Sequence, residues 1–476
     1  MTATDITPHL DALRALLGPE HVKTGGEAAP WSRDWPGHAH WTPLAVVRPA
    51  NTQQVAQVVK WANETGTPIV PVSGNTGLVE GSTAEGAVMV SLDRMSAIRE
   101  VRATSQIAIV EAGAILSNIH AAAEAHDLIF PLTFGARGSA MIGGALSTNA
   151  GGSNVVRYGN TRHLCLGIEA VLPTGEVVDL MSELRKDNSG YDLRDLLIGA
   201  EGTLGIITAA VLKLHPKPRA YATAMVAAPS LKDALTLLNT LQQETGGAVE
   251  AFEFMPRVYM EAYLERFPEA RAPFDGMHDI NILVEIGALS PRDATPGPDG
   301  QVPVTAHLEE VLGRLFETGA ILDAAVAQSD AQRQEMWARR EASAEVARLR
   351  QPLVDNDIAV PLDRMQDLLE RITENAQALD PGLIPMCVAH LGDGNLHFAG
   401  WPSTEDPETL NKIKDMVDDT AIALGGSFSA EHGVGLTKKP AMSRHKHPAA
   451  LQAMRAIKHV LDPNGIMNPG KVLPDD

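Results

Sequence analysis

Three glycine-rich segments within residues 71–208 constrain the fold of this chain more than any other feature. The first, PVSGNTGLVEGS, directly follows the apolar stretch TPIV. The second, residues 134–154, contains six glycines, and the third, DLLIGAEGTLGIIT, carries three more in an apolar run. Glycine lets backbone amides approach a bound anion closely. Any one segment could be a plain surface turn, but three together predict an extended ligand along a backbone-lined groove.

The first glycine segment lies in a strand–helix–strand pattern that begins at Pro43. Its helix, NTQQVAQVVKWANETG, has Val55, Val58, Val59 and Ala62 on one face, which predicts a buried stripe. The segment matches neither G-x-G-x-x-G nor G-x-x-x-x-G-K-[ST], so the ordinary dinucleotide fold and the P-loop lose support.

Strands and helices recur along the rest of the chain. A second strand–helix pattern covers residues 106–126, and Pro173-Thr174-Gly175 predicts a hairpin turn. With 476 residues the chain exceeds one usual core. The prolines of LHPKPRA mark a break, beyond which alternating strands and helices predict an α+β second domain.

Composition excludes several classes of function. Lys and Arg number 39 against 59 Asp and Glu, a net charge of -20, which argues against nucleic-acid and anionic-membrane surfaces. Cys165 and Cys387 form no CxxC, so disulfide frameworks and thiolate zinc sites are disfavoured. The N-terminus has no secretion signal, and no apolar run approaches the roughly 20 residues of a membrane span. We expect a cytoplasmic enzyme without a transmembrane segment.

Two histidines frame the turn in HLGDGNLH. His390 and His397 lie seven residues apart, whereas neighbours on a helical face lie three or four apart, so a strand, a tight turn and a second strand could bring them together. The segment SFSAEHGVGLTKK adds Glu431 and His432. Imidazole and carboxylate form a usual ligand set for zinc, manganese or iron with open positions. The alternative is that Glu431 and His432 are surface residues at a strand end.

His432 is also a candidate general base, because imidazole titrates near working pH. Adjacent residues of a regular strand face opposite sides. For Glu431 and His432 to serve one site the backbone must turn, and Gly433 and Gly435 would permit it.

Four signatures resemble a known family and occur in its order: LRKDNSGYDLRDLLIGAEGTLGIIT, HLGDGNLH, SAEHGVGLTKKP and DPNGIMNPGKVLP. Together they resemble flavoproteins of the vanillyl-alcohol oxidase and p-cresol methylhydroxylase type, within the D-2-hydroxyglutarate and D-lactate dehydrogenase branch. The resemblance implies a two-domain α+β flavoprotein with a p-cresol methylhydroxylase-type FAD-binding domain and an α+β substrate (cap) domain. We expect an N-terminal helical segment (1–39), the FAD-binding domain (40–218), the cap domain with a metal site (219–445) and a C-terminal segment (446–476) that packs back on the FAD domain.

The resemblance also implies FAD and its contacts. The expected FAD-binding residues are Ser73, Gly74, Asn75, Thr76, Gly77, Gly144, Thr148, Asn149, Gly151, Glu201, Ile206 and Asn468. Some relatives attach FAD through a histidine of the first loop or a cysteine of the second. Neither residue occurs there, so we expect non-covalent FAD.

The resemblance assigns His390, His397 and Glu431 to a divalent metal, with zinc expected from family habit, and His432 to the base and substrate contact. In MWARREASAEVARL it favours Arg340 as the clamp for the substrate carboxylate, which a guanidinium fork suits. The alternative is a helical ion pair of Arg340 with Glu341 or Glu345.

The implied reaction is oxidation of a D-2-hydroxy acid to the 2-oxo acid, with D-2-hydroxyglutarate as the first candidate. Asp355-Asn356 and Ala399 stand where a lysine and a polar residue would be expected for a second carboxylate, so D-lactate or another monoacid stays open. The sequence also allows two further functions, a flavin subunit of a glycolate-oxidase-like complex and a metal-dependent hydrolase. We expect electron-transfer flavoprotein or a quinone as acceptor, and a homodimer.

Overall fold

The computed structural model describes residues 3–475 and divides the chain into two compact units. The first unit holds the chain up to Gly151, Gly159–Pro216 and the chain from Glu431 on. The second holds Gly152–Tyr158 and Lys217–Ala430. The chain therefore crosses between the units at 151/152, 158/159, 216/217 and 430/431.

The first unit contains a four-stranded sheet in the order β1-β2-β4-β3. Its strands are Val22–Lys23 (β1), Ala45–Val47 (β2), Ile69–Val72 (β3) and Val88–Ser91 (β4). β4 runs parallel to both β2 and β3, and the predicted helix, Thr52–Thr65 (α2), connects β2 to β3. The Asn51 side chain caps α2, Gly66 ends it at φ 65, and its predicted apolar stripe is buried.

A five-stranded antiparallel sheet completes the first unit, in the order β5-β6-β10-β8-β9. Its strands are Ile98–Arg102 (β5), Ile107–Glu111 (β6), Cys165–Val171 (β8), Val177–Leu180 (β9) and Ile206–Lys213 (β10). The predicted hairpin joins β8 to β9, and Gly175 takes φ 83 in its turn. The helix Leu116–Glu124 (α3) follows β6, and Leu128–Ile129 (β7) pairs with His215–Pro216 (β11).

The C-terminal segment joins this first unit. Two helices, Lys439–His445 (α15) and Pro448–Leu461 (α16), precede a stretch that runs beside β3. The Ile69 amide donates to the Ile466 carbonyl, and the Asn468 amide donates to the Ile69 carbonyl, each at 2.8 Å. The NPGK motif therefore lies beside the strand that leads into the first glycine loop.

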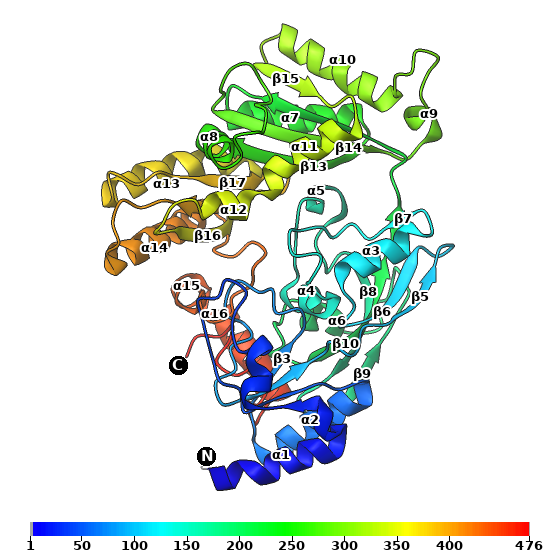
Figure 1. The fold of residues 1–476 in the computed structure, drawn as a ribbon, viewed down its shortest axis with the longest axis vertical. Helices are drawn as coiled ribbons and strands as arrows, with labels where there is room; N and C mark the ends of the chain where they lie inside the picture. The colour runs from blue at the N-terminus through cyan, green and yellow to red at the C-terminus, as the bar shows by residue number, and fades with distance from the viewer. Residues whose placement is uncertain (1–2, 476) are drawn as a thin grey trace. The chain divides into compact units, whose positions relative to one another are not determined.

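The second unit is built on a seven-stranded antiparallel sheet in the order β15-β12-β14-β13-β17-β18-β16 (Figure 1). Its strands are Ala220–Ala227 (β12), Val249–Pro256 (β13), Ile280–Ala288 (β14), Asp323–Val326 (β15), Val354–Ala359 (β16), Cys387–His390 (β17) and Asn395–Gly400 (β18). The predicted α+β architecture is confirmed, and the helix Pro407–Ala423 (α14) lies beside β16 (Figure 1).

Helices cover both faces of this sheet. Leu231–Glu244 (α7), Pro303–Glu317 (α10), Met365–Leu379 (α13) and α14 share one apolar core with alternate strand residues such as Ala224 and Phe252. On the opposite face Met225, Leu283 and Val388 pack with Arg257–Arg266 (α8), Asp330–Glu341 (α11) and Ser343–Ala347 (α12). A polar group that is buried on either face therefore needs a partner.

A buried ion pair holds residues 152–158, which begin at the end of the second glycine segment, within the second unit. Within this stretch lies a short helix, Val155–Tyr158 (α5). Arg157 Nη1 lies 2.5 Å from Glu250 Oε1, and the Tyr158 hydroxyl donates to the same oxygen at 2.9 Å. Burial raises the pKa of the Glu250 carboxyl, and the Arg157 charge opposes that rise.

We predict that Arg157→Met destabilises the second unit by about 3–5 kcal/mol at neutral pH, because it leaves the Glu250 carboxylate buried without its cation. The pKa of Glu250 then rises further above its unfolded value, so the loss shrinks as pH falls through that raised pKa. Denaturant unfolding at pH 7 and pH 5 measures both effects. The double variant Arg157→Met, Glu250→Gln is the control and should recover much of the loss; equal losses in single and double variants would contradict the prediction.

Candidate functional site

The three glycine segments come together within the first unit. A Cβ atom added to Gly74, in the first segment, would collide with the Ser139 carbonyl oxygen of the second. A Cβ atom on Gly202, in the third segment, would lie 2.5 Å from Pro71 Cγ in the first. Glycine is required at both positions because the segments pack closely against one another. The three loops therefore lie against one another, as a single site built from them would require.

The first loop offers backbone donors. Within the part of the chain that the structure describes, the amides of Gly74, Asn75, Thr76 and Gly77 donate to no protein acceptor. A Cβ atom on Gly77 would meet nothing within 4 Å, so space lies beside the loop. The Asn75 side chain instead holds the loop, donating to the Arg33 carbonyl at 2.8 Å. Adjacent amides without a protein acceptor fit the diphosphate of FAD.

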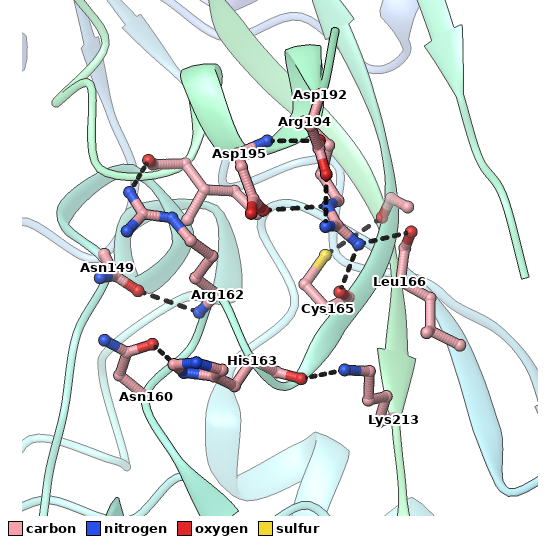
Figure 2. A network of polar contacts seen from close by, with 12 residues as sticks. Asn149, Asn160, Arg162, His163, Cys165, Leu166, Asp192, Arg194, Asp195 and Lys213 are labelled. Carbon is pink, nitrogen blue, oxygen red and sulfur yellow. Dashed lines mark hydrogen bonds and ion pairs between the residues drawn. The ribbon is translucent and has the colours of Figure 1, made fainter. Parts of the chain in front are cut away.

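The second loop leaves the short helix Ile142–Thr148 (α4) at Asn149, whose φ is 53. Its side-chain oxygen accepts the Arg162 amide at 2.9 Å, and the Arg162 guanidinium donates to the Ile198 carbonyl at 2.6 Å (Figure 2). The Thr148 hydroxyl donates to the Gly144 carbonyl at 3.2 Å. These expected FAD-binding residues thus lie at the loop, but the side chains of Thr148 and Asn149 already hold its backbone.

A neighbouring network, which the sequence did not reveal, holds the third loop. Arg194, in Leu193–Leu197 (α6), pairs with Asp192 and Asp195 and donates to the carbonyls of Cys165 and Leu166 at 3.1 Å (Figure 2). This arginine therefore ties α6 to the start of β8. The loop that follows α6 leads directly to Glu201 and to Ile206, the buried first residue of β10.

Glu201 connects the third loop to the segment that carries His432. Its carboxylate accepts the amides of Val434 at 2.7 Å and Gly435 at 2.8 Å. Burial raises the pKa of this carboxyl, while the two amides act against the rise. Gly433 and Gly435 have φ of 82 and 50, so the backbone turns directly after His432.

Asn468 connects the C-terminal motif to two loops. Its side-chain amide donates to the Gly81 carbonyl at 3.1 Å and to the Glu201 carbonyl at 2.8 Å. The residue is 2 % exposed, and its side-chain oxygen has no protein partner. An unsatisfied buried acceptor beside the glycine loops fits a donor group of a bound cofactor.

A group of possible metal ligands lies where β16 and β18 pair. Asp357, His397, Glu431 and His432 each offer one ligand atom, and these atoms all lie within 4.8 Å of one another. The β16–β18 register pairs Asp357 with His397. Glu431 and His432 directly follow Ala430, whose amide donates to the Asp357 carboxylate at 3.2 Å. Two carboxylates and two imidazoles suit zinc, manganese or iron.

His390 lies next to this group but not in it. Its ring and that of His397 meet edge to face with centroids 5.3 Å apart. His390 Nδ1 lies 2.8 Å from Glu253 Oε2, and Arg340 Nε lies 2.7 Å from the same oxygen. The expected carboxylate clamp, Arg340, and the expected metal ligand, His390, therefore contact the same acid, Glu253, which the sequence analysis did not identify.

Asp357 and Glu253 are the two acids that sequence reasoning missed. Each is a fully buried acid within a strand. Because acids are rarely buried without a partner, an acid within a strand was the feature of the sequence that could have identified them. The register places them on the sheet face of His390 and His397, because Glu253 pairs with His390 and Asp357 with His397.

Two known families together match most of the chain. Residues 43–181 match the FAD binding domain family, and residues 217–472, more than half of the chain, match the C-terminal domain of FAD linked oxidases. The chain belongs to the FAD-linked oxidase family. It is an FAD-dependent oxidoreductase. Among the described residues, no helix has both the length and the apolar character that crossing a membrane requires.

Similar proteins agree with this assignment. D-2-hydroxyglutarate dehydrogenase of Stutzerimonas stutzeri is 33% identical, over 97% of this chain and 98% of its own length. The mitochondrial D-2-hydroxyglutarate dehydrogenase of Bos taurus is also 33% identical, over 98% of this chain and 83% of its own. p-Cresol methylhydroxylase shares the fold, with a TM-score of 0.75, 17% identity and coverage of 100% and 98% of the two chains.

We predict that Glu201→Ala loosens the turn after His432, because two buried amides lose their acceptor at roughly 1–3 kcal/mol each. Hydrogen exchange of residues 433–435 should quicken at least about tenfold, since about 1.4 kcal/mol corresponds to tenfold. Glu201→Gln keeps one acceptor oxygen and should give an intermediate rate. The exposed acid in Glu64→Ala provides a control. Unchanged exchange in Glu201→Ala would show that the carboxylate does not hold this turn.

Proposed function

We propose that this oxidoreductase uses FAD and a divalent metal to oxidise a D-2-hydroxy acid to the corresponding 2-oxo acid. The observation that carries the proposal is the group of Asp357, His397, Glu431 and His432, with Arg340 beside His390. A 2-hydroxy acid presents a carboxylate and a neighbouring hydroxyl, which suit a cation and an adjacent base. The similar proteins named D-2-hydroxyglutarate dehydrogenase support this class of substrate.

More side chains could act as metal ligands here than one ion needs from the protein. We assign the metal to His390, His397 and Glu431, as the resemblance implies, with Asp357 as a further ligand or as the acceptor that orients His397, whose Nδ1 lies 3.7 Å from Asp357 Oδ1. Zinc is the metal we favour, because imidazole and carboxylate are its usual partners.

When bound, FAD supplies a hydride acceptor and the metal supplies a positive charge that makes the substrate hydroxyl more acidic. His432 takes the hydroxyl proton on one ring nitrogen, and the turn at Gly433 and Gly435 holds its backbone. As that proton leaves, the substrate carbon gives up its hydrogen with both electrons, and a carbonyl forms. Arg340 keeps donors beyond the one that faces Glu253, so its guanidinium can hold the substrate carboxylate.

FAD contacts come from the three loops and Asn468. We propose that the free amides of residues 74–77 bind the diphosphate, and that Ser73, Gly144, Gly151 and Ile206 line the site through backbone and packing contacts. FAD binds non-covalently in this proposal: the first loop has no histidine, the second no cysteine, and both cysteines of the chain are buried.

D-2-Hydroxyglutarate is the first candidate substrate, on the strength of the relatives. One observation favours a monoacid such as D-lactate instead. The β16–β18 register pairs Asp355 with Ala399, two positions from the Asp357–His397 pair and on the same face. An exposed acid there would repel a second carboxylate rather than bind it.

The acceptor is proposed to be electron-transfer flavoprotein or a quinone, and the assembly a homodimer. A second candidate role is a flavin subunit of a glycolate-oxidase-like complex, which would have little turnover alone. A metal-dependent hydrolase would leave the three glycine loops without a role, and family membership accounts for them.

We predict that anaerobic D-2-hydroxy acid bleaches the flavin band of the purified protein and that the L-enantiomer does not. D-Lactate, D-malate and D-2-hydroxyglutarate, each with its enantiomer, identify the substrate by the rate of bleaching. A chelator should slow bleaching at least about 100-fold, because the hydroxyl loses its polarising cation, and added zinc or manganese should restore it.

Dithionite reduction of the chelated protein is the control that the flavin is still bound and reducible. Purified protein that takes up no FAD, or equal bleaching by both enantiomers, would contradict the proposal. Fast bleaching with D-acid but no turnover with dye acceptors would favour the complex-subunit role.

A further inference from the structure

Glu253 occupies the middle of β13, between β14 and β17, and is 0 % exposed. The strand register pairs it with Leu283 on one side and His390 on the other. A carboxylate enclosed this completely is unfavourable unless charges and donors satisfy it. Its partners therefore explain why an acid stands in the core of this sheet.

One carboxylate serves two functional side chains. Glu253 Oε1 and Oε2 lie 2.9 and 2.8 Å from His390 Nδ1, and Oε2 also lies 2.7 Å from Arg340 Nε. The carboxylate of Glu253 therefore lies between a guanidinium nitrogen and an imidazole nitrogen, the two groups on this face that can donate to it.

The tautomer of His390 follows from this contact. An ionised carboxylate only accepts hydrogen bonds, so Nδ1 carries the hydrogen and Nε2 of the neutral ring keeps its lone pair. A metal ligand needs that lone pair, and a carboxylate on the far nitrogen is the usual device that provides it. The Arg340 guanidinium lies 3.5 Å from the His390 ring nitrogens, so the clamp and the ligand are neighbours as well as partners of one acid.

We propose that Glu253 is a positioning residue that couples the metal site to the carboxylate clamp, fixing the tautomer of His390 and the orientation of Arg340 with one carboxylate. This inference rests on the proposed function. It means that the metal ligand and the clamp cannot move independently, because they share an anchor.

The unit contains a matched control in Glu285 on the neighbouring strand β14. Glu285 is also buried and lies on the same face, and it pairs with Arg333 of α11 at 2.6 and 2.7 Å. Its other partners are the Trp337 indole and the Thr223 hydroxyl. Glu285 thus resembles Glu253 in being buried and in pairing with an arginine of α11, but it contacts no histidine among the described residues.

The test compares Glu253→Gln with Glu285→Gln in the full-length, FAD-loaded, metal-depleted protein. A glutamine at 253 has one acceptor oxygen and one donor nitrogen, so it cannot accept from His390 and Arg340 as the carboxylate does. We expect zinc affinity, measured by titration calorimetry, to fall about 10–100-fold in Glu253→Gln. In Glu285→Gln the zinc affinity should stay within about threefold of the wild-type value. Both variants lose the charge of a buried acid, but Glu285 does not contact a proposed metal ligand. Flavin content and melting temperature are measured on both.

Equal zinc affinity in Glu253→Gln and the wild type, or an equal loss in both variants, would overturn the inference. A wild-type protein that binds no zinc or manganese would instead remove the metal from the proposed function. The wild type also provides a measurement that needs no variant at position 253. In metal-free, histidine-labelled protein, 15N NMR should show His390, assigned with His390→Asn, as the Nδ1–H tautomer. An Nε2–H tautomer would overturn the inference.

Discussion

The register of the second unit's sheet is the constraint on which the candidate site depends. Paired residues of neighbouring antiparallel strands project to the same face. The Glu253–His390 and Asp357–His397 pairs therefore place two acids and two imidazoles on one face of a sheet whose other face packs on a large apolar core. A slip of one residue would send them into that core, where an unpaired acid is unfavourable. The packing that stabilises the sheet thus also fixes the chemistry on it.

The first unit uses a different device, the close approach of one loop to another. Gly74 and Gly202 allow three loops to meet, and Glu201 and Asn468 then connect these loops to the His432 segment and the C-terminal motif. The side chains expected to touch FAD mostly hold loop backbone instead. Free amides and one free amide oxygen are left for the cofactor, which explains why glycines dominate the sequence of this region.

Sequence reasoning predicted the features that local pattern determines. The helix Thr52–Thr65 and the hairpin after β8 were predicted from apolar spacing and turn residues, and both are confirmed. Strand partners lie far apart in the chain, so no local pattern could pair Asp357 with His397 or Glu253 with His390. The resemblance implied that His390 is a metal ligand. Its contact with Glu253 could be found only from the cross-strand register.

We propose that imidazoles and carboxylates on this face of the sheet bind a metal ion. X-ray absorption at the zinc edge of the zinc-loaded protein, together with the metal content per chain, is the sharpest test of that site. We expect one zinc per chain, nitrogen and oxygen ligands at about 2.0–2.2 Å, and the multiple scattering that imidazole produces. A sulfur shell at about 2.3 Å, absent imidazole scattering, or failure to retain one zinc would contradict it.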